Sequence, residues 1–378
     1  MAAIALSLAA IGGVGLALNA AGLASAWHFG TQLGGEFGPA PPMTVLRPLC
    51  GAEPGLEAAL ASTLCQMGPG QQAIFGVQNP ADPAIAVVRR LQARLPALDI
   101  TLVIDATPHG GNRKIGNLIN MLPHAKHELL VFCDSDLHVP AGYLARLAEV
   151  LAEPGVGLAT TVCLGLPTGP GWVARLGATG ISHGFTPAAL MARWLGRQDC
   201  LGTTMALRRQ TLAAVGGLAM LRDHLADDNV LGQLVQGLGL KVALARTVPL
   251  TGVAEARLAD LWRHEMRWAR TIRALEPFAY AGTFVLYPLV WAMLAVAAAP
   301  GWRSAGFFLL AWGLRAMMAG MGARCLAGQR APAVPVLLLP IRDVVSFIEV
   351  GWAFVGSRVV WRGRVMTADA GAPVIARL

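Results

Sequence analysis

Hydrophobic and polar positions alternate in two different ways along the chain. Between residues 40 and 256, short apolar runs of strand length alternate with stretches whose apolar residues recur every three to four positions. Strands separated by amphipathic helices predict an α/β fold with a doubly wound, mostly parallel sheet. The predicted strands are residues 43–49, 73–78, 100–104, 129–133, 156–162 and 200–209, and the predicted helices are residues 55–67, 84–95, 141–152 and 230–238.

Both ends of the chain are apolar over much longer stretches. Residues 2–27 hold no charged side chain, and a helix of about 20 residues suffices to cross a bilayer. A secretory signal is the competing interpretation, but the stretch lacks a basic start and is too long for one. The later apolar segments are residues 277–300, 305–327 and 331–361, and charges within the last one favour a partly interfacial or re-entrant segment.

Composition agrees with a membrane protein. Hydrophobic residues make up 55% of the chain and charged residues 14%, and the net charge is +8. Arginines crowd near the apolar segments, which indicates juxtamembrane charge on the cytoplasmic side and argues against a nucleic-acid partner. The six cysteines suggest neither a zinc site nor a disulfide framework. The predicted parts are an N-terminal transmembrane helix (1–28), a cytosolic catalytic domain (40–256), an interfacial helix (257–276), C-terminal transmembrane or re-entrant helices (277–361) and a tail (362–378).

Two carboxylates, Asp134 and Asp136, directly follow the strand predicted at residues 129–133. An open α/β sheet binds its ligand at the carboxyl ends of such strands. In this D-x-D arrangement both side chains can leave the strand on the same side and offer hard oxygen ligands to Mg²⁺ or Mn²⁺ that carries a diphosphate. A turn in which Asp bonds its own backbone is the simpler alternative. The metal interpretation implies a nucleotide-linked donor.

Two further loops carry groups that suit a nucleotide. Asp82 follows the strand at residues 73–78 and is expected on the same edge of the sheet, although an Asp before Pro also caps turns. Residues 109–118 form a glycine-rich, basic loop that opens a helix. Its backbone N–H groups and the charge of Lys114 suit phosphate oxygens, and a plain solvated loop is the alternative.

Asp227 and Asp228 stand at the start of the helix predicted at residues 230–238. Capping and the helix dipole favour acids at this position in any protein. The functional interpretation is that one of them is a general base for an acceptor hydroxyl, and periodicity favours neither. Residues 262–270 form a basic, aromatic helix that either lies at the membrane interface or holds a guanidinium against a leaving diphosphate.

Short motifs follow one another in a characteristic order: R-P-L (47–49), V-Q-N-P-A-D-P-A-I (77–85), R-K-I-G-N-L-I-N-M-L (113–122), C-D-S-D (133–136), G-T-T-M-A-L-R-R (202–209), A-D-D-N (226–229), R-W (267–268) and V-V-W-R-G-R (359–364). Together they resemble the ceramide glucosyltransferase family of inverting glycosyltransferases (families 2 and 21). The nearest resemblance is to its bacterial branch associated with hopanoid biosynthesis. The similarity covers about residues 40–275 and the C-terminal tail.

The resemblance implies roles for the acidic positions. The family's first aspartate, expected near the uracil and ribose, is Asp82. Its metal-binding position is Asp136, with Asp134 beside it. Its catalytic base is Asp228, with Asp227 as the rival. The implied fold is a nucleotide-sugar-binding domain of the GT-A type with transmembrane or interfacial helices at both ends.

The resemblance also implies contacts from basic and polar residues. Arg267 and Trp268 match the family's R-W, and Arg267 is expected to neutralise charge on the leaving diphosphate. His264 stands where Gln or Arg is usual, so a protonated His264 or the preceding Arg263 is the candidate phosphate contact. The remaining implied donor contacts are Lys114, Asn117 and Pro48.

The implied reaction is the transfer of a sugar from a UDP-sugar to a lipid hydroxyl, with inversion and with Mg²⁺ or Mn²⁺ as cofactor. The resemblance alone implies N-acetylglucosamine as the sugar, a hopanoid polyol (bacteriohopanetetrol) as the acceptor and the bacterial inner membrane, in a multi-pass topology, as the location. The alternatives are a glucosyltransferase acting on ceramide or diacylglycerol and, in a different class, a catalytically silent membrane scaffold. The membrane segments are too few for a polymer channel, which favours a non-processive enzyme.

Overall fold

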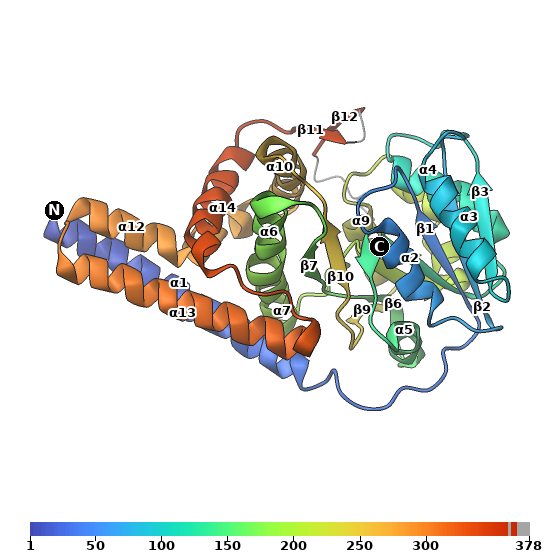
Figure 1. The fold of residues 1–378 in the computed structure, drawn as a ribbon, viewed down its shortest axis with the longest axis horizontal. Helices are drawn as coiled ribbons and strands as arrows, with labels where there is room; N and C mark the ends of the chain where they lie inside the picture. The colour runs from blue at the N-terminus through green and yellow to red at the C-terminus, as the bar shows by residue number, and fades with distance from the viewer. Residues whose placement is uncertain (362–363, 369–378) are drawn as a thin grey trace. The chain divides into compact units, whose positions relative to one another are not determined.

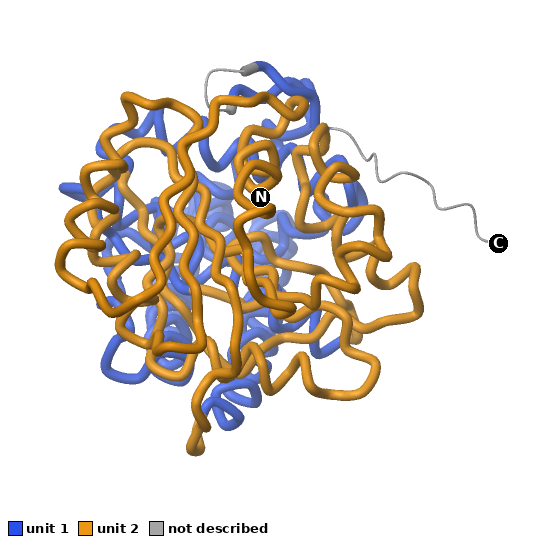
Figure 2. Tube along the Cα trace, turned by 90° about the vertical axis from the view of Figure 1, so that its right-hand side faces the viewer, with its two compact units in different colours: residues 1–33, 164–195, 255–370 blue, residues 34–163, 196–254, 371–378 orange. Residues whose placement is uncertain are grey.

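The computed structural model describes residues 1–361 and 364–368, so most of the predicted tail (362–378), with Arg362 and Gly363 of the last motif, lies outside the described residues. The chain folds into two compact units (Figure 2). As far as they are described, residues 1–33, 164–195 and 255–370 form the helical unit, and residues 34–163 with 196–254 form the sheet unit. Residues 164–195 therefore cluster with the apolar helices, although they lie inside the predicted catalytic domain.

A seven-stranded sheet in the order β3-β2-β1-β4-β8-β6-β9 forms the centre of the sheet unit (Figure 1). Strands β1 to β4 pair in parallel, β9 pairs in parallel with β6, and β8 runs antiparallel to both β4 and β6. The mostly parallel sheet confirms the predicted α/β class. The strands are β1 (Met43–Pro48), β2 (Gln71–Val77), β3 (Asp99–Ile104), β4 (Leu129–Cys133), β6 (Val156–Thr160), β8 (Thr204–Arg208) and β9 (Lys241–Leu244).

The sheet unit buries its strands under helices. β2 is buried along its whole length, which explains the continuous apolar run at residues 73–77. Its core includes Leu46, Ile74 and Phe132 from strands and Leu118 and Leu231 from helices. The helices are α2 (Leu56–Leu64), α3 (Ala84–Arg94), α4 (Arg113–Met121), α5 (Tyr143–Ala152), α8 (Arg209–Ala214) and α9 (Asp227–Gly237), with 3₁₀ turns η1 (Leu122–His124) and η3 (Leu218–Leu221).

A short antiparallel pair lies beside the end of β4. Strand β5 (Leu137–His138) pairs with β10 (Leu250–Val253), and Thr251 stands opposite Leu137. Because β5 follows the D-x-D pair directly, this pairing brings β10 next to the two carboxylates.

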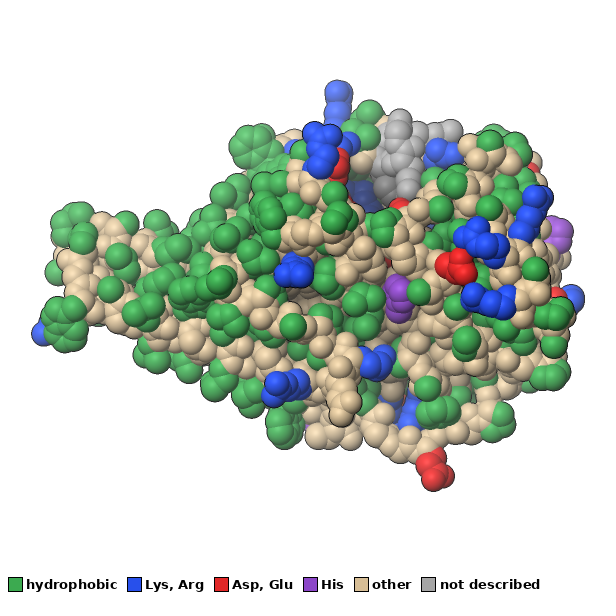
Figure 3. Space-filling view, in the orientation of Figure 1, with side chains coloured by type: hydrophobic (Ala, Val, Ile, Leu, Met, Phe, Trp, Pro, Cys, Tyr) green, Lys and Arg blue, Asp and Glu red, His purple; other side chains and the backbone are tan. Residues whose placement is uncertain are grey.

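The helical unit contains the apolar ends of the chain. Helix α1 packs along α12 and α13, and also contacts α7. Apolar side chains cover the surface of α1, α12 and α13 (Figure 3). The elements are α1 (Ala2–Gly30), β7 (Leu164–Pro167), α6 (Gly171–Gly180), the π-helix η2 (Ile181–Phe185), α7 (Thr186–Trp194), α10 (Leu258–Leu275), α11 (Pro277–Gly282), η4 (Thr283–Leu286), α12 (Pro288–Ala298), α13 (Trp302–Ala327), η5 (Gly328–Arg330), η6 (Val336–Leu338), α14 (Leu339–Ala353), β11 (Arg358–Trp361) and β12 (Arg364–Thr367).

Two helices of the described chain, Ala2–Gly30 and Trp302–Arg330, are long and apolar enough to cross a membrane. The segment predicted as a span at residues 277–300 is bent by 61° between η4 and α12, so it is either a broken span or a re-entrant loop. Length and composition thus support membrane association through both ends of the chain.

Residues 165–196, which follow no single period in the sequence, are mostly helical. Their sequence follows no single period because the π-helix at Ile181–Phe185 lies directly between α6 and α7. A π turn adds a residue per turn and shifts the 3.6-residue pattern, so the two halves of the helical segment present different faces. These residues therefore form a helical segment of the unit that also contains α1.

Candidate functional site

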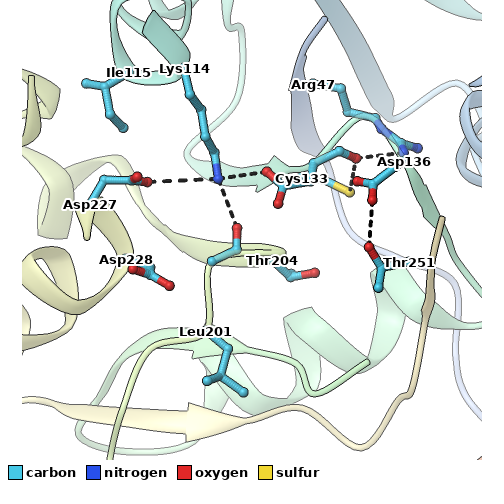
Figure 4. Close-up of polar contacts among 12 residues, drawn as sticks. Arg47, Lys114, Ile115, Cys133, Asp136, Leu201, Thr204, Asp227, Asp228 and Thr251 are labelled. Atoms are coloured by element: carbon cyan, nitrogen blue, oxygen red, sulfur yellow. Dashed lines mark hydrogen bonds and ion pairs between the residues drawn. The ribbon is translucent and has the colours of Figure 1, made fainter. Parts of the chain in front are cut away.

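The D-x-D pair lies at the carboxyl end of β4, as the sequence predicts. The Asp134 backbone N–H donates to the Thr203 carbonyl at 3.1 Å, which ties the loop to the start of β8. Thr251 of β10 donates its hydroxyl to Asp136 Oδ2 at 2.6 Å (Figure 4). Burial and the nearby charge of Asp134 raise the pKa of Asp136 to about 6. Asp134 is thus held close enough to disfavour the ionisation of Asp136.

Lys114 lies between the D-x-D pair and the acids of α9 (Figure 4). Its Nζ is 2.7 Å from Asp134 Oδ1 and 3.9 Å from Asp227 Oδ2, and it donates to the Gly202 carbonyl at 3.0 Å. Burial alone would lower the pKa of Lys114, but the charges of Asp134 and Asp227 outweigh it and raise the pKa above its usual value. Lys114 therefore keeps its positive charge and links the ends of three separate loops.

The two adjacent acids of α9 have different surroundings. Asp227 is buried, and its Oδ1 accepts a hydrogen bond from the Asn112 side chain at 3.1 Å. Asn112 lies in the glycine-rich loop predicted from the sequence but was not singled out there, and it also caps α4 by accepting from the Ile115 N–H at 3.1 Å. Asp227 is therefore fixed between the starts of two helices.

Asp228 is only partly buried, and its Oδ1 accepts from the backbone N–H of the next residue, Asn229, at 2.8 Å. Burial and the neighbouring Asp227 raise the pKa of Asp228 to about 6. Its Oδ2 faces Gly202, where an added Cβ would come within 2.7 Å. A partly exposed carboxylate with a raised pKa is suited to accept a proton near neutral pH, so the geometry favours Asp228 over Asp227 as a base.

Asp82 is buried and its carboxylate makes three backbone contacts. Both oxygens accept from the Gly51 N–H at 3.0 Å, and Oδ1 also accepts from the Ala84 N–H at 2.9 Å. Gly51 has φ +81°, a conformation that favours glycine. These are the contacts of the capping alternative, and a contact between Asp82 and a nucleoside stays a prediction.

Pro48 and Asn117 lie where β1, β2 and α4 meet. Pro48 ends β1 opposite Gly76, and the Asn117 side chain donates to the Gly76 carbonyl at 2.7 Å. The Asn117 Oδ1 is buried and accepts no hydrogen bond from the described residues. In this conformation Asn117 holds α4 against β2, and the predicted donor contacts of both residues stay predictions.

The H-x-x-R-W residues lie on α10 in the helical unit. His264 Nδ1 is 2.6 Å from Glu255 Oε1, and the His264 and Trp268 ring centroids are 4.4 Å apart. The Arg267 guanidinium lies over the Trp268 ring at 5.8 Å. The phosphate contact expected of His264 stays a prediction.

A sequence profile of glycosyl transferase family 21 matches residues 7–374. The chain belongs to glycosyl transferase family 21. The resemblance found in the motifs is thereby confirmed at the level of this family, and its hopanoid-associated branch stays a prediction.

Curated relatives carry the name ceramide glucosyltransferase. Ceramide glucosyltransferase 1 of Caenorhabditis elegans is 21% identical over 238 residues, which are 63% of this chain and 51% of that protein. The ceramide glucosyltransferase of Candida albicans is 30% identical over 114 residues, 27% of this chain and 21% of that protein. The match thus spans about half the length of the first relative and a smaller share of the second.

A solved structure with the same overall fold is the mannosyltransferase PcManGT from Pyrobaculum calidifontis, in complex with GDP-Man and Mn²⁺. It aligns with 93% of this chain and 98% of its own, at 21% identity and a TM-score of 0.52. This likeness shows the fold, which is a GT-A-like glycosyltransferase fold with apolar helices at both ends of the chain.

Proposed function

We propose that this chain is a membrane-bound, non-processive glycosyltransferase that transfers a sugar from a UDP-sugar to a lipid hydroxyl with inversion. The observation that carries the proposal is the joining of Asp134, Asp227 and the Gly202 loop by Lys114, with Asp136 and Asp228 beside them. In a member of family 21, this geometry supports a divalent-metal pair, a phosphate-binding cation and a base at one edge of the sheet.

The carboxylates at the end of β4 fit a divalent cation. Asp134 and Asp136 offer hard oxygen ligands, and a bound cation would relieve the repulsion that raises the pKa of Asp136. Among the described residues no group of three or more His, Cys, Asp or Glu side chains could hold a metal ion. This suits Mg²⁺ or Mn²⁺ held by one or two carboxylates and the donor's own phosphates. When bound, the cation supplies charge stabilisation to the leaving diphosphate.

The residues of the chain then divide the remaining tasks. Asp228 accepts the proton of the acceptor hydroxyl as that oxygen forms a bond to the anomeric carbon and the bond to the UDP oxygen breaks. Lys114 binds the diphosphate, and the motif resemblance assigns the same charge-neutralising task to Arg267, with His264 and Trp268 beside it. Because the acceptor attacks opposite the leaving group, a single displacement inverts the anomeric configuration without a covalent intermediate.

Two pairs of donor and acceptor compete. The motif resemblance supports N-acetylglucosamine transfer to a hopanoid polyol at the bacterial inner membrane. The names of the curated relatives support glucose transfer to ceramide. Diacylglycerol is an alternative acceptor for that glucose. In both cases the apolar helices hold the enzyme at the bilayer that contains its acceptor.

Purified full-length enzyme, incubated with a panel of UDP-sugars and defined lipids, tests the proposal by mass spectrometry of the products. Asp228→Asn should abolish transfer and leave UDP affinity unchanged, whereas Asp99→Asn, which removes one partner of an exposed ion pair with Lys126, should leave both unchanged. Turnover by Asp228→Asn would refute the base assignment. Absence of metal-dependent UDP binding in wild-type protein would favour the silent scaffold.

A further inference from the structure

Arg47 of β1 is a fully buried arginine whose described hydrogen-bond partners include no carboxylate. One terminal nitrogen, Nη1, donates to the Ala59 carbonyl at 2.9 Å and to the Thr63 hydroxyl at 2.8 Å, both on α2. The other, Nη2, donates to three carbonyls of the D-x-D loop, those of Asp134 at 2.8 Å, Ser135 at 3.1 Å and Leu137 at 2.8 Å.

This arrangement is unusual for a buried charge. A fully buried guanidinium is expensive to desolvate and is normally paired with an acid. Here the compensation comes from carbonyl dipoles of the loop that carries the two predicted metal ligands. The nearest part of the site is anionic, so the Arg47 charge also opposes the repulsion between Asp134 and Asp136.

The three carbonyls fix the shape of the loop. Each peptide group is planar, so a fixed carbonyl also fixes the N–H of the following residue. The carbonyls of Asp134 and Ser135 therefore set the two peptide planes between the carboxylates, and the Leu137 carbonyl sets the plane beyond them. With the carbonyls directed at Arg47, the direction in which each carboxylate leaves the backbone is determined.

Helix α2 and the turn that follows it also support the residues after this loop. The Val139 N–H donates to the Ser62 hydroxyl at 3.0 Å, and the Tyr143 N–H donates to the Gln66 side chain at 3.0 Å. The guanidinium is thus the central link between α2 and the residues that follow β4.

We propose that Arg47 is a positioning residue for the metal and diphosphate site, which acts by holding the D-x-D loop in the shape that lets Asp134 and Asp136 bind one divalent cation together. The inference rests on the proposed function, because it assigns the loop to metal binding. It predicts that the planar fork of Arg47, and not its charge alone, determines metal affinity.

The test measures Mn²⁺ binding by electron paramagnetic resonance in full-length detergent-solubilised protein with UDP. Arg47→Lys keeps the charge and loses the fork, and should weaken Mn²⁺ binding by about tenfold or more, the usual effect of removing support from a metal ligand. Arg209→Lys is the matched control. Arg209 also donates to backbone carbonyls, those of Ala125 at 2.8 Å and His127 at 3.2 Å, but near the opposite end of β4. It should bind Mn²⁺ like the wild type.

A second variant keeps the test decisive if Arg47→Lys does not fold. Thr63→Val removes one acceptor of the guanidinium at nearly constant side-chain volume, and should weaken Mn²⁺ binding by a smaller factor, about threefold. If both variants fold and bind Mn²⁺ with wild-type affinity, the inference is overturned. If Arg47→Lys does not fold, wild-type Mn²⁺ affinity in Thr63→Val alone overturns it. Wild-type protein that binds no Mn²⁺ with UDP would overturn the proposed metal function as well.

Discussion

Gly202 is the residue whose substitution tests the base most directly. Its carbonyl accepts from Lys114, and a Cβ at this position would lie 2.7 Å from Asp228 Oδ2 and 3.2 Å from Asp228 Cγ. Ordinary contact needs about 3.5 Å, so in Gly202→Ala the carboxylate oxygen must move by about 0.8 Å. The Asp228 Oδ1 is held by the Asn229 N–H, so the side chain cannot turn away without losing that bond.

A displacement of about 1 Å at a reacting group costs on the order of 10²-fold in rate. We therefore expect Gly202→Ala to lower kcat about 100-fold while the Kd for UDP stays within a few-fold of wild type. Gly70→Ala is the matched control, because its Cβ would meet nothing closer than Pro42 Cγ at 3.8 Å. The assay is product formation under saturating donor, with UDP binding by calorimetry. A Gly202→Ala enzyme with wild-type kcat would refute the placement of the base beside this glycine.

Three further predictions address the acid pair and the helical unit. As the proposed base, Asp228 must be deprotonated to act, so kcat should fall as the pH drops below about 6. Asp227→Asn removes a charge that raises the pKa of Asp228, so this variant should shift the acidic limb of the pH–kcat profile to lower pH. Thr251→Val is the control, because it removes the hydrogen bond that lowers the pKa of Asp136. A shift of the acidic limb to higher pH in this variant alone would assign that limb to the ionisation of Asp136. Arg342→Met leaves the partly buried Glu265 and the buried Glu349 without their shared cation and should destabilise the protein by about 3–5 kcal/mol in detergent unfolding. Stability equal to that of the exposed control Arg303→Met would contradict this pairing. Gly15→Val should lower the unfolding temperature because a Cβ there meets the Val285 carbonyl and Pro288, while Gly13→Val, which meets nothing within 4 Å, should not; similar melting of the two would refute glycine-mediated packing of α1.

The strands of the sheet could be predicted because burial on both faces produces a recognisable run of apolar residues in the sequence. Strands β2 and β4 have nearly every residue buried, and their sequences contain continuous apolar runs, residues 73–77 in β2 and residues 129–133 in β4. Residues 165–196 were not predictable in the same way. A five-residue π-helix changes the period inside that segment, and a search for one constant period finds none.

The candidate site could be predicted where the residues that mark it lie close together in the sequence. Asp134 and Asp136 stand out because they directly follow a buried strand. The choice between Asp227 and Asp228 depends on partners distant in sequence, since Asn112 lies 115 residues before Asp227 and Gly202 meets only Asp228. Arg47 was missed as a site residue for the same reason, because its loop partners lie 87 to 90 residues away.

The buried charges near the C-terminus show how the motif on α10 is connected to the apolar helices. Sequence alone places Arg342 and Glu349 inside an apolar segment, where each would be costly. In the helical unit the Arg342 guanidinium binds Glu265 of α10 at 2.7 and 2.9 Å and Glu349 of α14 at 2.6 Å. Glu265 is two residues before Arg267, so the arginine that compensates the buried acids also fixes the helix that presents the R-W pair. A substitution in α14 that displaces Arg342 should therefore also displace the R-W pair on α10.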